Sequence, residues 1–170
     1  TIGLEVDAQL LADASPHEPR TLDAHLRLLI EARIVYARHR LDRVFYTFRH
    51  ALIRDAAYES MPPTLRRSNH TRVARALAMK TDRGTGAQPF RVAQHFAHAG
   101  VFAEAIGHGI EAARRALDRS LYDDSIRYAQ SACDWLDKAD YAEREHDSAH
   151  LHSTLTHATM ARFGWADPRV

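Results

Sequence analysis

Apolar residues recur at helical spacing along most of this chain, and that spacing limits the folds open to it. Leu22, Leu26, Leu29 and Ile30 stand at i, i+4, i+7 and i+8, so they share one face of a helix. From residue 89 onward the pattern is helical throughout and rich in alanine. The sequence therefore predicts a mainly α fold, in which helices bury apolar faces against one another.

One stretch departs from this spacing and predicts a β-hairpin. Ile34–Tyr36 and Val44–Phe48 are runs of β-branched and aromatic residues, which favour strands. The polar segment 38–43 separates them and would form a charged tip. Because so short a hairpin is not stable alone, we expect it to pack against the neighbouring helices.

The helices around the hairpin follow the order of a winged-helix-like module. A short helix is expected at 6–14, and the helix that contains Leu22 follows it. After the hairpin, a helix beginning near His50 ends at Pro62–Pro63, because proline interrupts a helix. The next helix is expected at about 64–80. In the helix that begins near His50, these apolar residues are predicted to face inward: Leu52, Ile53, Ala56 and Ala57.

A break in the pattern divides the chain into two modules. Residues 81–88 include Gly84 and Gly86 and show no apolar periodicity, which is typical of a linker. The winged-helix-like module would then span 1–80, and a second, helical module would span 89–170.

The second module contains a weak internal repeat. Gly100–Ile106 and Ser120–Ile126 each show a break residue, an aromatic residue, acids, a small residue and then isoleucine. Such a repeat predicts TPR-like antiparallel helical hairpins joined by tight turns. The last helix is expected at about 141–163, and a repeat array would normally continue beyond it.

The charge and the cysteine content of the chain exclude few classes of function. The formal net charge is +1, but bases outnumber acids between Arg20 and Arg75, and acids outnumber bases between Glu104 and Asp147. Cys133 is the single cysteine, so no intramolecular disulfide can form. No apolar run approaches the roughly 18 residues of a membrane-spanning helix, and the first residues contain no signal-peptide pattern. We therefore expect a cytoplasmic protein with no membrane partner.

Three segments carry a resemblance to a known family. Residues 48–60 read FRHALIRDAAYES, residues 65–77 read LRRSNHTRVARAL, and residues 92–100 read VAQHFAHAG. The first two resemble the winged-helix junction of STAND-type signal-transduction ATPases, bacterial regulators fused to cyclase, kinase or LuxR-type domains. The third resembles the start of their TPR-like region.

The resemblance implies that this chain is a regulatory part of a larger ATPase. The ATPase core, which binds ADP or ATP, would lie before Thr1. No G-x-x-x-x-G-K-[ST] phosphate-binding loop occurs in the chain. We therefore expect no cofactor in this segment and no catalytic activity from it.

The resemblance also implies a role for His50. In STAND-type proteins a winged-helix histidine at this place reaches the bound ADP and helps to hold the inactive state. His50 is therefore a candidate nucleotide-sensing residue, which would act only together with the ATPase core. An imidazole at a strand-to-helix junction can project from the fold and hydrogen-bond a phosphate oxygen. The alternative is a histidine that closes the hairpin or caps a helix.

A group of arginines predicts a basic surface on the first module. Guanidinium groups on this surface could contact DNA phosphates, or they could dock the ATPase core. The helix at 21–33 would be the one to read DNA bases, but it offers Glu31, which repels phosphates. DNA binding is therefore the less favoured interpretation. The arginines are Arg38, Arg40 and Arg43 near the hairpin tip, and Arg66, Arg67, Arg72 and Arg75 in the following helix.

The 12 histidines raise the question of a metal site. His146 and His150 are spaced i, i+4, and His95 and His98 are spaced i, i+3, but a site needs a third or fourth ligand. We expect these histidines at the surface and predict no metal.

Other reactive side chains have structural explanations. Asp123 and Asp124 suit the first turn of a helix, where the helix dipole favours acids. Cys133 is predicted to lie in the core, and Trp135 and Trp165 are predicted to be packing residues.

These features lead to one hypothesis and two alternatives. The chain would be a non-catalytic relay of a bacterial STAND ATPase. An unknown protein or small-molecule effector on the TPR-like helices would alter the nucleotide state of the core. The main alternative is a DNA-binding winged-helix regulator with a helical sensor or dimerisation tail. The other is a repeat scaffold with no switching role.

Overall fold

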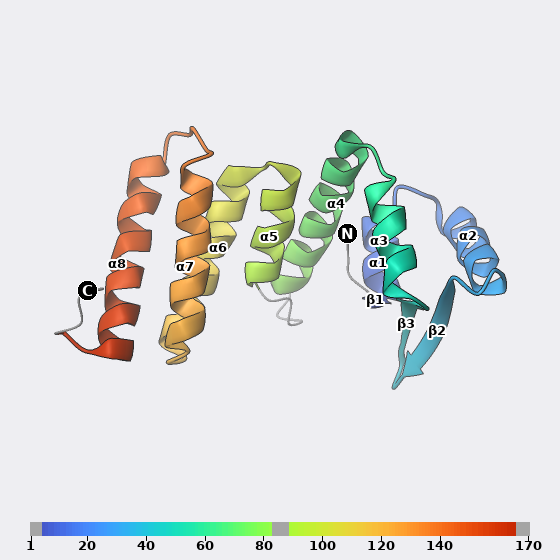
Figure 1. Ribbon diagram of the computed structural model, residues 1–170, viewed down its shortest axis with the longest axis horizontal. Helices are drawn as coiled ribbons and strands as arrows, with labels where there is room; N and C mark the ends of the chain where they lie inside the picture. Colours follow the sequence, from blue (N-terminus) through green and yellow to red (C-terminus); the bar gives the residue numbers. More distant parts are fainter. Residues whose placement is uncertain (1–4, 83–88, 166–170) are drawn as a thin grey trace. The chain divides into compact units, whose positions relative to one another are not determined.

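The computed structural model describes residues 5–82 and 89–165 of a mainly helical chain (Figure 1). The chain divides into two compact units, residues 1–77 and 78–170. Most of the predicted linker at 81–88 lies outside the described residues, which resume at Pro89.

A small antiparallel sheet organises the first unit. Strands β2 (Val35–Arg40) and β3 (Arg43–Phe48) pair with each other, which confirms the predicted hairpin. Strand β1 (Glu5–Asp7) pairs with the opposite edge of β3, so the strand order is β1-β3-β2 (Figure 1). The sequence did not indicate this third strand. The prediction of a helix from residue 6 is therefore wrong, and helix α1 (Ala8–Ala14) starts two residues later.

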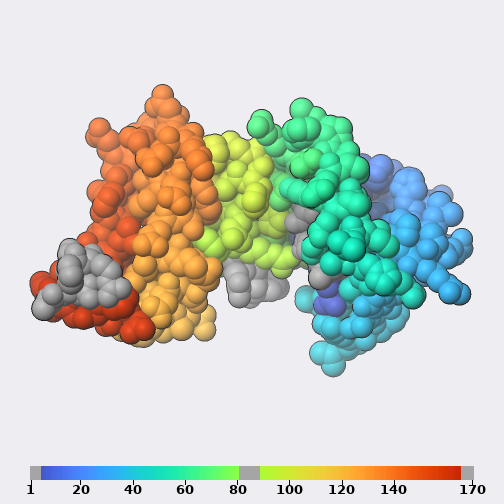
Figure 2. Space-filling view, in the orientation of Figure 1, coloured from blue at the N-terminus to red at the C-terminus, as the bar shows by residue number. Residues whose placement is uncertain are grey.

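The hairpin tip is narrower than the sequence predicted. Arg40 lies opposite Arg43 in the register, so only Leu41 and Asp42 form the turn. The backbone ladder extends through the polar residues because their side chains stay in solvent at the edge of the unit. The tip projects from the first unit at the cyan end of the surface in Figure 2.

Three further helices complete the first unit: α2 (Pro19–Glu31), α3 (Ala51–Glu59) and the first part of α4 (Pro63–Asp82). Pro19 and Pro63 begin their helices, at positions where the missing N–H of proline costs no hydrogen bond. Leu26 of α2 and Val35 of β2 are buried. Helix α4 contributes a buried stripe that consists of Val73, Ala74, Ala76 and Leu77.

The inward orientation predicted for helix α3 is wrong. Leu52 is 81% exposed, Ile53 is 37% exposed, and Ala56 and Ala57 are also exposed. Helix α3 holds no buried residue at all. Helical spacing identifies an apolar face, but the tertiary arrangement decides whether anything covers it.

The second unit is an array of helices: α5 (Pro89–Ala99), α6 (Phe102–Asp118), α7 (Tyr122–Leu136) and α8 (Arg144–Phe163). Each helix packs against the next, and α8 also contacts α6 (Figure 1). The core of this unit is made of Ile106, Ala113, Ala129, Ala132, Leu136 and Leu151. Small residues allow a close approach of the helices, most clearly at Gly109, which lies against Ala132 and Trp135 of α7.

The internal repeat corresponds to a repeated helix ending. Gly100 and Ser120 have φ of 78° and 59°, and the residue after each donates its N–H to a carbonyl five positions earlier. These bonds join Val101 to Phe96 and Leu121 to Ala116, at 3.0 and 2.9 Å. This left-handed cap closes a helix and turns the chain within two or three residues. The predicted tight turns after α5 and α6 are thereby confirmed.

Candidate functional site

His50 stands between β3 and α3, where the sequence placed it. Its backbone is extended, and its carbonyl accepts hydrogen bonds from the N–H groups of Ile53 and Arg54 at 3.2 and 3.4 Å. The imidazole is exposed and does not cap the helix. Within the described residues it has no hydrogen bond or ion pair. His50 is thus free to contact another molecule, and a capping role for its side chain is excluded.

The α3–α4 corner, at the opposite end of α3 from His50, is held by a group of contacts that the sequence did not reveal. The Tyr58 hydroxyl lies 3.0 Å from Nε2 of His70, which is buried. The guanidinium of Arg66 lies 5.1 Å from the centre of the Tyr58 ring and donates to the carbonyls of Glu59 and Met61. This contact joins α3 to α4, since Tyr58 belongs to α3 and His70 to α4.

The arginines near the hairpin tip are engaged within the first unit. Nη1 of Arg40 lies 2.9 Å from a carboxylate oxygen of Glu5, and Nη1 of Arg43 lies 3.7 Å from one of Asp7. The guanidinium of Arg38 lies over the Tyr36 ring, 4.9 Å from its centre. Both carboxylates come from β1, the strand that the sequence did not indicate. They offset two of the three positive charges of Arg38, Arg40 and Arg43.

The other predicted arginines belong to α4. Helix α3 leads away from the sheet, and α4 begins at the far end of α3 (Figure 1). Arg66 is used in the α3–α4 corner, and Arg72 is half-buried. Arg67 and Arg75 are exposed. The structure therefore uses several of the predicted arginines in contacts within the first unit.

The two histidine pairs differ in how far their side chains are exposed to solvent. His146 and His150 are exposed on α8, with ring centres 4.6 Å apart. His98 is exposed, but His95 is only 7% exposed, so the prediction of a surface position is wrong for His95. In residues 5–82 and 89–165, no three His, Cys, Asp or Glu side chains cluster in a way that could hold a metal ion.

The remaining reactive residues lie mostly as predicted. Asp123 and Asp124 occupy the first turn of α7. Cys133 packs against the core of the second unit, and burial raises the pKa of its thiol. Trp135 packs there too, but Trp165 is 82% exposed, so its prediction as a packing residue is wrong.

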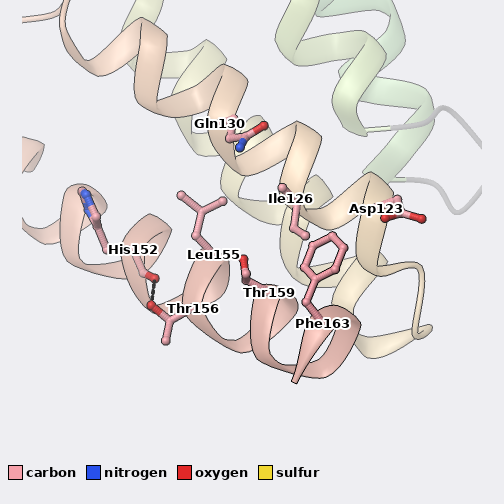
Figure 3. A pocket seen from close by; sticks show the side chains of 8 residues that line it. All are labelled: Asp123, Ile126, Gln130, His152, Leu155, Thr156, Thr159 and Phe163. Atoms are coloured by element: carbon pink, nitrogen blue, oxygen red, sulfur yellow. Dashed lines mark hydrogen bonds between the residues drawn. The ribbon is translucent and has the colours of Figure 1, made fainter. Parts of the chain in front are cut away.

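The second unit also has a groove that the sequence did not indicate. Helices α7 and α8 line it with Ile126, Gln130, His152, Leu155, Thr156, Thr159 and Phe163, and Asp123 lies at one end (Figure 3). Its volume is about 440 Å³. Ile126 of α7 and Leu155 and Phe163 of α8 point into the space between the two helices (Figure 3). The spacing of these residues is helical on both helices, but only the packing of α7 on α8 shows which stripes face each other.

Comparison with known proteins gives no further assignment, since the chain matches no protein-family model, no curated protein and no solved structure. Among the described helices, none combines the length and the apolar character needed to cross a membrane.

Proposed function

We propose that this chain is a non-catalytic regulatory and protein-interaction segment of a bacterial STAND-type signalling ATPase of the cytoplasm. The first unit would dock on the ATPase core of the parent chain, and His50 would contact ADP bound there. Helices α5–α8 would receive a protein or small-molecule effector. The segment itself would bind no cofactor and catalyse no reaction.

One observation carries this proposal: an exposed, unengaged imidazole lies next to an uncovered apolar helix face. Within residues 5–82, the His50 imidazole has no hydrogen bond or ion pair, and Leu52 and Ile53 of the adjacent helix are 81% and 37% exposed. Large exposed apolar side chains grouped on one short helix favour a protein interface over a solvated surface. An imidazole at the edge of such an interface can donate a hydrogen bond to a phosphate.

The relay would act through a shift between two states of the parent protein. An effector on α5–α8 changes that equilibrium only by its differential affinity for the two states. The ADP-bound state would be favoured by the contact of His50 with the nucleotide and by burial of the apolar face of α3. An effector that binds better when the first unit is released would therefore promote loss of ADP.

The test is the rate at which the full-length parent protein releases ADP. We expect His50→Ala to release ADP at least about tenfold faster, because a hydrogen bond to a charged phosphate is lost. His39→Ala is the matched control, since His39 is exposed in the same unit but lies on β2. An unchanged release rate in His50→Ala would contradict the proposed contact with the nucleotide.

The DNA-binding alternative is tested with the same chain. Arg67 and Arg75 are exposed, and this observation keeps the alternative open. We expect no binding to a labelled mixed-sequence duplex in fluorescence anisotropy, even at low salt. Binding that weakens steeply as salt rises would instead favour phosphate contacts by the arginines.

A further inference from the structure

Two exposed histidines on α8 lie close enough to bind one solute together. His146 and His150 are four residues apart, so they share one face of the helix and stand one turn from each other. Their ring centres are 4.6 Å apart, and the ring planes meet at 62°, so the rings do not stack face to face. Within residues 5–82 and 89–165, neither imidazole has a hydrogen bond or an ion pair. Both rings are therefore open to a ligand from solution.

The separation of the two rings matches that of two imidazoles bound to one metal ion. An imidazole nitrogen binds a transition metal at about 2.0–2.1 Å. Two rings that share an ion at this distance have centres roughly 4.5–5.3 Å apart, with the lower value for nitrogens at right angles and the upper for a tetrahedral ion. The observed 4.6 Å lies at the right-angle end, and right angles are typical of Cu²⁺ and Ni²⁺.

The charged residues around this pair favour a cation. Arg144 is the only base in residues 143–150, and its Nε donates to the carbonyl of Leu136 at 3.2 Å, so its guanidinium is engaged at the end of α7. The same stretch contains three acids: Glu143, Glu145 and Asp147. Acids therefore outnumber bases by three to one beside the two rings, and this excess of negative charge attracts a divalent cation.

We propose that His146 and His150 form a two-nitrogen site for a divalent transition metal ion that prefers imidazole, with Cu²⁺ bound most tightly. Water fills the remaining positions of the ion, so the ion exchanges with solvent. Structural and catalytic sites use three or four protein ligands, and no such cluster occurs in residues 5–82 and 89–165. The sequence prediction of no metal rested on the missing third ligand, which an exchangeable site does not need. This inference goes beyond the proposed function and does not depend on His50.

A second pair of histidine rings, in the first unit, provides a comparison. His17 and His25 have ring centres 5.3 Å apart, and both side chains are exposed. His17 lies before the start of α2 at Pro19, so the spacing of one helix does not fix this pair. Residues 17–27 contain two acids and two bases, so their charges balance. We therefore expect the tighter site on α8.

The test is calorimetric titration of the whole chain with Cu²⁺, Zn²⁺ and Ca²⁺ in a buffer that does not bind them. We expect Cu²⁺ to bind more tightly than Zn²⁺, and Ca²⁺, which prefers oxygen ligands, not to bind. His150→Ala should raise the Cu²⁺ dissociation constant of the tightest site at least about tenfold, because one helix face no longer offers two nitrogens. Electron paramagnetic resonance of Cu²⁺ added below one equivalent should show two imidazole nitrogens, and His150→Ala should remove that signature.

Two matched variants separate this site from other histidines. His25→Ala breaks the pair in the first unit. His157→Ala removes an exposed histidine of α8 that has no other histidine three or four residues away. Both should leave the tightest Cu²⁺ site unchanged. Circular dichroism of His150→Ala should match that of the unaltered chain, since the position is exposed and alanine favours a helix.

Three results would overturn the proposal. Loss of the tightest Cu²⁺ site in His25→Ala, with no change in His150→Ala, would place the ion in the first unit. Equal binding of Ca²⁺ and Cu²⁺ would mean that the acids hold the ion by charge alone. A resonance spectrum with a single imidazole nitrogen in the unaltered chain would show that the two rings do not share the ion.

Discussion

At the scale of single residues, a close contact between α6 and α7 depends on one glycine. A Cβ atom at Gly109 would lie 3.0 Å from Cβ of Ala132 and 3.3 Å from a ring carbon of Trp135. At Gly107, on the same helix, a Cβ atom would meet nothing within 4 Å. Both positions carry the conformational cost of glycine in a helix, but only Gly109 lies where a larger side chain would meet the neighbouring helix. A comparison of the two positions therefore distinguishes these two effects on stability.

We expect opposite effects when alanine replaces these two glycines. Gly107→Ala should stabilise the chain by about 0.5–1 kcal/mol, the usual gain in a helix interior. Gly109→Ala should destabilise it by about 1–2 kcal/mol, because the added methyl group overpacks the contact with α7. Urea unfolding followed by circular dichroism measures both values. An equal gain in the two variants would show that α7 moves aside without cost.

The free energy with which Glu111 stabilises the fold depends on pH, because its carboxyl group has a lowered pKa. Burial acts to raise the pKa of its carboxyl group, but hydrogen bonds from Arg115 and Arg114 outweigh this, and the pKa lies below the ordinary value of 4.5. A carboxyl group with a lowered pKa stabilises the fold above its unfolded pKa and loses that effect as the pH falls through the folded value.

The corresponding prediction concerns Glu111→Gln. This variant should melt slightly below the unaltered chain at pH 7, and the difference should shrink as the pH falls below about 4. Thermal unfolding at a series of pH values provides the measurement. The effect is small, since the ion pairs of Glu111 lie at the surface. A difference that grows toward acid would contradict the assignment.

At the scale of elements, the helix endings explain why the second unit was predictable. The break residues Gly100 and Ser120 both adopt the left-handed conformation that ends a helix. This signal is local, since it needs only one residue and its nearest neighbours in the chain. The apolar residue that follows each cap is local too. The order of α5, α6 and α7 could therefore be predicted from the sequence alone.

The first unit was less predictable because its deciding contacts are distant in sequence. Strand β1 forms only through pairing with β3, about forty residues later in the chain (Glu5 lies opposite Thr47). The carboxylates of Glu5 and Asp7 then form ion pairs with Arg40 and Arg43 of the hairpin. His50 could be placed at its junction from local pattern, but the exposure of α3 beside it could not. The α7–α8 groove could not be predicted from the sequence either, because it depends on which faces of the two helices pack against each other.

The two caps give a reciprocal prediction. The left-handed backbone conformation at position 120 costs free energy for serine but not for glycine. Ser120→Gly should therefore stabilise the chain by about 1 kcal/mol. Gly100→Ser introduces the same cost after α5 and should destabilise the chain by a similar amount. A Cβ atom at Gly100 meets nothing within 4 Å, so the effect is conformational and not steric. Denaturant unfolding of both variants tests the pair, and a loss of stability in Ser120→Gly would contradict it.

At the scale of the whole molecule, the division into units at 1–77 and 78–170 predicts separate responses to core damage. Ala113 is fully buried in the second unit, and its carbonyl accepts a hydrogen bond from the Ser125 hydroxyl at 2.9 Å. An unpaired carboxylate at this position costs several kcal/mol, which exceeds what a small helical array can absorb. Ala103 lies in the first turn of the same helix and is exposed, so an acid there is favoured by the helix dipole.

Ala113→Asp should therefore unfold the helices of the second unit while the sheet of the first unit persists. Hydrogen exchange of the β2 and β3 amides reports on the first unit, because these amides belong to the paired strands 35–48. Ala103→Asp is the matched control and should leave protection in both units unchanged. If the strand amides lose protection together with α6 and α7 in Ala113→Asp, the two units unfold as one. The relay proposed above would then act through the shared stability of the two units. Independent unfolding would instead favour a proposed effector that acts through the docked state of the proposed parent protein.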